Sequence, residues 1–176
     1  MKSAKIRLWE TVLFALLGAL MFASKQALEF LPNVHMLAML TVLYTVVFRV
    51  KALIPIYVFV LLEGIIAGFS AWWIPYFYLW TVLWGLAMLI PRNLPPVPFS
   101  ICLMAVCAFH GLIYGTLYAP FQALYYGLSF KGMIVWIITG LPWDFVHCVS
   151  NLFMGALIYP VYVPFKKAID KFYKTA

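Results

Sequence analysis

Apolar runs of about 14–22 residues dominate this chain, and short breaks rich in Pro, Gly, Trp or charged residues separate them. The runs do not alternate apolar and polar residues with a period of two, which excludes the strands of a membrane barrel. A helix needs roughly 20 residues to cross the hydrocarbon core of a bilayer. The pattern therefore predicts six transmembrane helices, over residues 9–30, 35–48, 52–70, 74–90, 99–126 and 132–164.

Prolines lie inside the last two of these ranges and near the end of the chain. Because proline removes a backbone donor and clashes with the preceding turn, Pro120 is expected to mark a break or bend in the fifth helix. Pro142 is expected to kink the sixth helix, and Pro164 to mark its end.

Composition agrees with the helical pattern, because 66% of the residues are hydrophobic and only 10% are charged. A soluble domain of this length needs a charged, mixed surface, which so few charged side chains cannot supply. In lipid, every backbone N–H and C=O must find a partner within the protein, and helices achieve this. We therefore predict an all-α integral membrane protein, a single-domain compact bundle of six transmembrane helices.

The basic residues predict the orientation, since short cytoplasmic loops collect Lys and Arg. An even number of spans puts both termini and two of the turns on the cytoplasmic side. That side then holds ten of the twelve basic residues: Lys2, Lys5, Arg7, Arg49, Lys51, Arg92, Lys166, Lys167, Lys171 and Lys174. Lys25 and Lys131 are the remaining two. We expect a multi-pass protein of the cell membrane, in a bacterium the cytoplasmic membrane, with N- and C-termini in the cytoplasm.

Polar side chains inside the expected helices are costly in lipid and often mark a binding site or a transport pathway. Asp144, His147 and Asn151 are spaced i, i+3 and i+7, which puts them on one helix face. Each candidate also has a purely structural interpretation. Lys25 can pair with Glu29 at i+4, Asp144 with His147, and a single histidine such as His110 can serve packing alone. Glu63 has no basic residue in its own helix, so it needs a partner from elsewhere or a proton.

Aromatic residues gather near the predicted outer surface, where a membrane-interface belt explains many of them. Some could instead form flat apolar walls around a ring-shaped ligand, with polar side chains fixing its edges. We expect such a pocket to open outward, and the loop around Pro32–His35 to help close it. The candidate substrate-binding residues are Asn33, His35, Glu63, Trp72, Trp73, Tyr76, Trp80, His110, Asp144, His147 and Asn151.

The first expected helix carries alanine at every fourth position: Ala15, Ala19, Ala23 and Ala27. A stripe of small residues lets another helix approach closely, because packing rather than the hydrophobic effect drives helix association in lipid. The stripe can serve packing within this bundle. Alternatively, Ala15, Ala19 and Ala23 form a docking face for a separate membrane subunit.

This stripe, the chain length and the stretch Gly140-Leu141-Pro142-Trp143-Asp144 resemble the substrate-binding S components of energy-coupling factor (ECF) vitamin transporters. The resemblance covers essentially the whole chain, including residues 141–151. It implies a subunit that captures a vitamin or vitamin precursor outside the cell for ATP-driven uptake. The implied partners are a membrane-embedded coupling subunit, which contacts the stripe, and two cytoplasmic ATPases.

The chain contains no GxxxxGK[ST] phosphate loop, so ATP hydrolysis would belong to those partners, and we expect a transport subunit rather than an enzyme. No cofactor or metal is expected. Abundant Trp and Tyr with few charges favour a small, near-neutral ring, such as hydroxymethylpyrimidine or a pyridoxine-like compound. Two alternatives stay open. One is a small intramembrane enzyme that uses Asp144, His147 and His110, and the other is a membrane anchor that binds haem or quinone.

Overall fold

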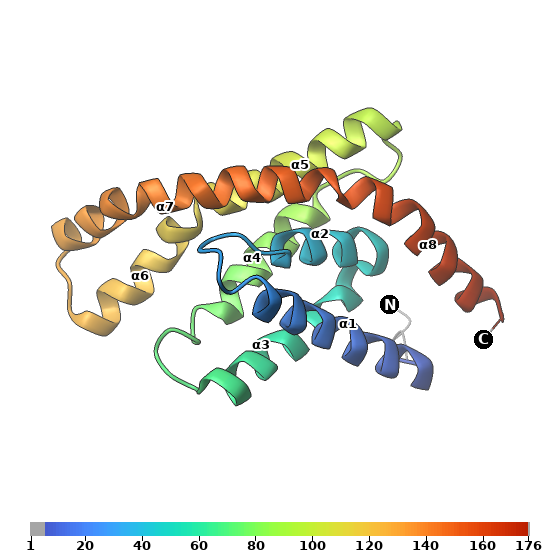
Figure 1. Cartoon of the computed structure of the whole chain (residues 1–176), viewed down its shortest axis with the longest axis horizontal. Helices are drawn as coiled ribbons and strands as arrows, with labels where there is room; N and C mark the ends of the chain where they lie inside the picture. The colour runs from blue at the N-terminus through green and yellow to red at the C-terminus, as the bar shows by residue number, and fades with distance from the viewer. Residues whose placement is uncertain (1–5, 176) are drawn as a thin grey trace.

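The chain folds into helices joined by short turns, and the computed structural model describes residues 6–175. Figure 1 shows their arrangement, in which the first helix begins and the last helix ends at the same end of the molecule. The elements in chain order are α1 (Leu8–Ala27), α2 (Leu37–Phe48), the 3-10 helix η1 (Arg49–Ala52), α3 (Leu53–Ala67), α4 (Tyr76–Met88), α5 (Pro96–Leu112), α6 (Tyr114–Tyr126), α7 (Phe130–Ala156) and α8 (Ile158–Thr175).

Four helical stretches of the described chain are long and apolar enough to cross a membrane: Leu8–Ala27, Leu37–Ala67, Pro96–Tyr126 and Phe130–Ala156. The helix α4 is also apolar but shorter. The second stretch changes direction at Arg49, whose backbone is left-handed with φ 57°. Large apolar side chains such as Leu16, Ile65 and Phe145 are more than 60% exposed, as expected of a surface that faces lipid. The prediction of an all-helical protein is confirmed, and these helices are compatible with a membrane protein.

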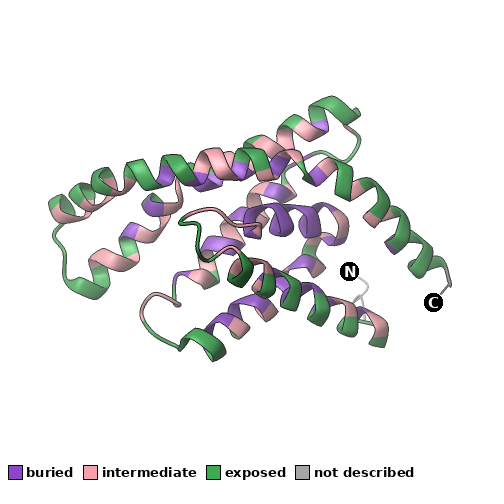
Figure 2. Ribbon diagram, viewed as in Figure 1, coloured by how far each residue is buried: buried purple, intermediate pink, exposed green. Residues whose placement is uncertain are grey.

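The helix α2 forms the centre of the molecule, and Figure 2 shows it buried along its length. Eleven of its 12 residues are buried, and it contacts α1, α4, α5, α7 and α8. A helix that is apolar on every side belongs inside a protein or a membrane. The other helices therefore surround α2 and supply the outer surface.

Two pairs of helices approach closely at glycines. On α1, a Cβ added at Gly18 would lie 2.5 Å from Val58 Cγ1, so the backbone of α1 rests directly on α3. On α5, a Cβ added at Gly111 would lie 2.8 Å from the carbonyl oxygen of His147 on α7. Small residues at such contacts are what holds helices together where the hydrophobic effect is weak.

The expected helix 99–126 is divided into α5 and α6 at Ile113 rather than at Pro120, which lies within α6. In an uninterrupted helix the Gly115 N–H would bond to the Gly111 carbonyl oxygen. Here it donates to Asp144 Oδ1 at 3.0 Å. A side chain inserted into the hydrogen-bond ladder is a recognised cause of helix bending.

The expected helix 132–164 is likewise two helices. The helix α7 continues through Pro142, and the division falls at Leu157, three residues before Pro160. Pro160 cannot donate to the Ala156 carbonyl, so the ladder is interrupted there. The chain then continues as α8 past Pro164 as far as Thr175.

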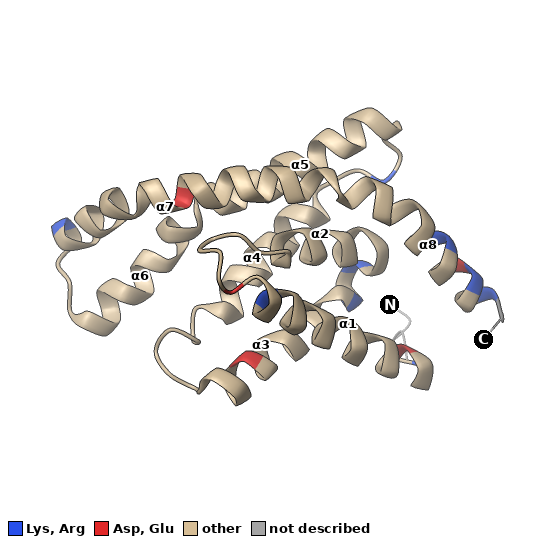
Figure 3. Cartoon of the chain, in the orientation of Figure 1, with Lys and Arg blue, Asp and Glu red and all other residues tan. Residues whose placement is uncertain are grey.

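Basic residues concentrate at the end of the molecule where α1 begins and α8 ends, as Figure 3 shows along α8 and near η1. There, Glu10 on α1 accepts hydrogen bonds from the Lys51 ammonium and the Tyr173 hydroxyl, and so ties α1, η1 and α8 together. Burial and this hydrogen bond raise the pKa of the Tyr173 phenol above its usual value. Lys2 and Lys5, assigned to the cytoplasmic side from sequence, lie outside the described residues.

Candidate functional site

Six side chains from five segments meet within the helical core, and we call them the buried polar cluster. His35 comes from the loop before α2, whereas α4, α5 and α6 contribute one residue each and α7 contributes two. The members of the buried polar cluster are His35, Trp80, His110, Tyr114, His147 and Asn151.

The rings of the buried polar cluster contact one another directly. The His35 and His147 rings have centroids 4.7 Å apart, and Tyr114 lies 4.9 Å from His147. Trp80 connects the two sides of the cluster, since its ring is 6.2 Å from His35 and 5.8 Å from His110. Three histidines and two aromatic rings thus form one continuous group.

Most of the nitrogen and oxygen atoms in the buried polar cluster lack a hydrogen-bond partner among the described residues. His110 Nε2 meets the Leu79 carbonyl oxygen at 3.1 Å. The unpaired buried atoms are His35 Nδ1, Trp80 Nε1, His110 Nδ1, His147 Nε2, Asn151 Nδ2 and Asn151 Oδ1. An unpaired buried polar group costs about 1–3 kcal/mol. A molecule that paired with several of these atoms would remove part of that cost.

The face of α7 that reaches this cluster is the one predicted from the i, i+3, i+7 spacing. Asp144, His147 and Asn151 are all buried, although the rest of α7 is largely exposed. Gly111 makes room for this face, because a Cβ there would lie 2.9 Å from Asn151 Nδ2. Asp144 bonds to the Gly115 backbone rather than to His147.

Glu63 on α3 is fully buried and forms an ion pair with Lys25 on α1. Pairing of Lys25 with Glu29, one interpretation left open by the sequence, is therefore not the pairing observed. The Lys25 ammonium also lies 6.0 Å from the centroid of the Trp72 ring. These charges join α1 and α3, and Glu63 has the partner from another helix that its burial requires.

Three other predicted site residues, Tyr76, Trp73 and Asn33, lie outside the buried polar cluster, and each makes different contacts. Tyr76 continues the aromatic group, because its ring is 5.7 Å from Trp80. Trp73 packs toward α3, where its Nε1 donates to the Val60 carbonyl oxygen at 2.7 Å. Asn33 occupies a left-handed turn position (φ 59°) in the loop before α2, a conformation that asparagine tolerates well.

Sequence reasoning missed Tyr114 as a member of the cluster. Its ring centroid lies 5.8 Å from that of His110 and 4.9 Å from that of His147. One signal was available, since Tyr114 follows His110 by four residues and so shares its helix face. Lys25 was missed as the partner of Glu63, because that pairing depends on how α1 packs against α3.

The alanines of α1 lie on its outer surface. Ala15, Ala19 and Ala23 are all exposed, and Leu16 and Leu20 beside them are 64% and 51% exposed. The contact of α1 with α3 instead uses Gly18 and its neighbours. Packing between helices of this chain therefore does not account for the stripe of alanines.

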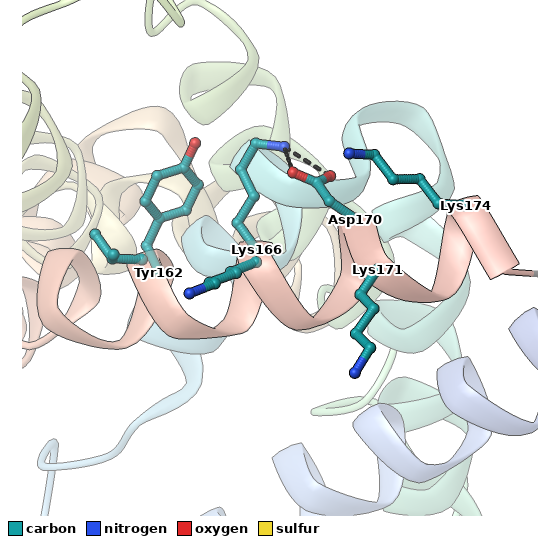
Figure 4. Close-up of a pocket in the computed structure, with 7 residues that line it drawn as sticks. Tyr162, Lys166, Asp170, Lys171 and Lys174 are labelled. Carbon is teal, nitrogen blue, oxygen red and sulfur yellow. Dashed lines mark hydrogen bonds and ion pairs between the residues drawn. The ribbon is translucent and has the colours of Figure 1, made fainter.

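A groove of about 590 Å³ runs along α8, far from the buried polar cluster, and Figure 4 shows its lysines. Lys166 pairs with Asp170 at 2.8 Å across one helical turn. All lining residues come from this single exposed helix, so the groove does not enclose a ligand. Its lysines suit contact with anionic lipid headgroups.

No group of three or more His, Cys, Asp or Glu side chains in residues 6–175 is arranged to hold a metal ion. Comparison with known proteins adds no relative, because no protein-family model, no curated protein and no solved structure matches this chain.

Proposed function

We propose that this chain is the substrate-binding membrane subunit of an ECF-type importer, which captures a small vitamin or vitamin precursor from outside the cell. The observation that carries the proposal is the buried polar cluster, with its six unpaired nitrogen and oxygen atoms among aromatic rings. Ligand sites combine such apolar walls with a few convergent polar groups. The hydrogen-bonding atoms of a small heterocyclic ring would pair with His110, His147 and Asn151.

The proposed membrane arrangement has six spans and both termini in the cytoplasm. The position of the basic residues supports it, because Arg7, Lys51 and the lysines of α8 share one end of the molecule. Lys131 lies at the start of α7, away from that end. The buried polar cluster then lies in the half of the protein that is nearer to the outside. In this arrangement the ligand enters from the outer surface, and ATP is hydrolysed by partner chains on the opposite side.

The proposed partners are a membrane-embedded coupling subunit and two cytoplasmic ATPases. Exposure of Ala15, Ala19 and Ala23 supports a docking face for the coupling subunit on α1. Small residues on such a face allow close approach of a second helix.

The experiment that tests the ligand-binding function is to purify the chain and identify its retained small molecule by mass spectrometry. We expect a small ring compound, lost from the His147→Ala and Asn151→Ala variants because these remove its polar partners. Thr139→Ala is the matched control, since Thr139 lies on the exposed side of the same helix. Equal retention in all four proteins would contradict this binding site.

A further inference from the structure

A groove of about 290 Å³ lies between α6 and α7, next to the buried polar cluster. Tyr118 and Tyr114 line it from α6, and Trp136, Gly140, Trp143 and Asp144 line it from α7. Its size suits a single small ring. Tyr114 belongs to both places, because its ring also lies 4.9 Å from His147.

The most unusual group in this groove is the Asp144 carboxylate, which is only 6% exposed. Its Oδ1 atom accepts from the Gly115 N–H, and this bond fixes the orientation of the carboxylate. Its Oδ2 atom is buried and has no hydrogen-bond partner among the described residues. A carboxylate oxygen in such a place is stabilised by an N–H donor or a positive charge.

The walls of the groove favour the same kind of ligand. Tyr118 and Trp136 stack with their rings 6.3 Å apart, and Trp143 adds a third aromatic side chain. Aromatic faces attract cations and stack on flat rings. None of the residues that line this groove is basic, so a bound molecule with an N–H donor or a positive charge would complement Asp144.

We propose that the groove between α6 and α7 binds a small aromatic ring that carries an amino group, with Asp144 Oδ2 as the acceptor of that group. The inference rests on the proposed function and narrows its substrate class from small rings in general to amine-bearing rings. Tyr114 separates the groove from the buried polar cluster. The ring therefore passes Asp144 and Tyr114 before it reaches His147 and Asn151.

Two matched pairs of compounds test the proposal on the purified chain. Pyridoxamine and pyridoxine differ by an amino group in place of a hydroxyl, and 4-amino-5-hydroxymethyl-2-methylpyrimidine differs likewise from its 4-hydroxy counterpart. Binding is measured by calorimetry and by quenching of tryptophan fluorescence. In at least one ring system, the amino compound is expected to bind at least tenfold more tightly. Asp144→Asn should bring the ratio of the two dissociation constants, hydroxyl compound over amino compound, close to one. Glu29→Gln removes an exposed carboxylate and should leave that ratio unchanged.

Gly140→Leu provides a second test that leaves Asp144 intact. A Cβ at Gly140 meets nothing within 4 Å, so this position has room for a side chain, and a leucine there would occupy part of the groove that Gly140 lines. It should weaken binding of the amino compound at least tenfold with the melting temperature unchanged, and unchanged affinity would overturn the proposal.

The outcomes separate this inference from the proposed function. If the rings bind but the amino group gives no advantage that depends on Asp144, the groove proposal is wrong and ring capture stands. If none of the four compounds binds the unaltered chain, ring capture and the groove proposal both fall.

Discussion

At the scale of single residues, the contact between Asp144 and Gly115 determines local structure on two helices. The side chain of Asp144 bends the α5–α6 segment by taking the Gly115 N–H. That contact is possible only because position 115 has no side chain, since a Cβ there would lie 2.5 Å from Asp144 Oδ2. Glycine at this position is thus a requirement of packing.

Gly115→Ala is therefore expected to destabilise the protein by about 1–3 kcal/mol, the usual cost of an extra carbon in a well-packed site. Thermal unfolding in detergent measures the loss. Gly85→Ala is the control, because a Cβ there meets nothing within 4 Å and alanine favours the helix. If both variants unfold at the same temperature, Asp144 does not pack against Gly115 as described.

The ion pair between Lys25 and Glu63 leads to a second prediction at this scale. Lys25→Met leaves the fully buried Glu63 carboxylate without its partner and should cost on the order of 3 kcal/mol. The double variant Lys25→Met with Glu63→Leu should recover most of that loss, because the buried carboxylate is then gone together with its partner. Denaturant unfolding in micelles gives the free energies, and Lys131→Met controls for removing an exposed lysine. Equal losses in the single and double variants would contradict the pairing.

Sequence spacing alone identified the polar face of α7, because Asp144, His147 and Asn151 belong to one regular helix. Spacing could not predict that His35 and His110 lie at that face. Their positions depend on how α5, and the loop that precedes α2, pack against α7. The same limit applies to Lys25, for which Glu29 was the nearer acidic residue in sequence and Glu63 is the partner in space.

At the scale of elements, α1 presents two different faces one residue apart. Gly18 rests against Val58 on α3, and Ala19 faces outward. The internal contact and the proposed docking face can therefore be altered separately.

Gly18→Leu should lower the melting temperature of the isolated chain, because its side chain would overlap α3, whereas Ala19→Leu should not. Ala19→Trp should instead disrupt co-purification with the coupling subunit and the ATPases, with Ala105→Trp, on the exposed side of α5, as the control. A complex that survives Ala19→Trp would exclude docking through this face.

Element boundaries were predictable where the cause is local and not where it is tertiary. Arg49 and Lys51 marked the turn between α2 and α3. By contrast, Pro120 and Pro142 do not end their helices. The helix divides at Ile113 because Asp144, 31 positions later in the chain, accepts the Gly115 N–H. No local sequence pattern reveals this contact.

At the scale of the whole molecule, the concentration of basic residues at one end predicts an orientation in the membrane that can be tested. Single cysteines at positions 131 and 167, in a background without Cys102, Cys107 and Cys148, report which side each lysine occupies. An impermeant maleimide added to intact cells should label Lys131→Cys, and Lys167→Cys only after permeabilisation. Labelling of both in intact cells would contradict the proposed topology.

The central position of α2 also has a consequence for biogenesis. With 12 residues, α2 is roughly 18 Å long, well short of a bilayer core of about 30 Å. Most of the helices that surround it emerge from the ribosome later, because α4, α5, α7 and α8 all follow it in the chain. Newly made α2 therefore has no stable place as an independent span until those helices are inserted. We expect nascent chains that end after α3 to be recognised by membrane quality control, and chains that end after α7 to escape it.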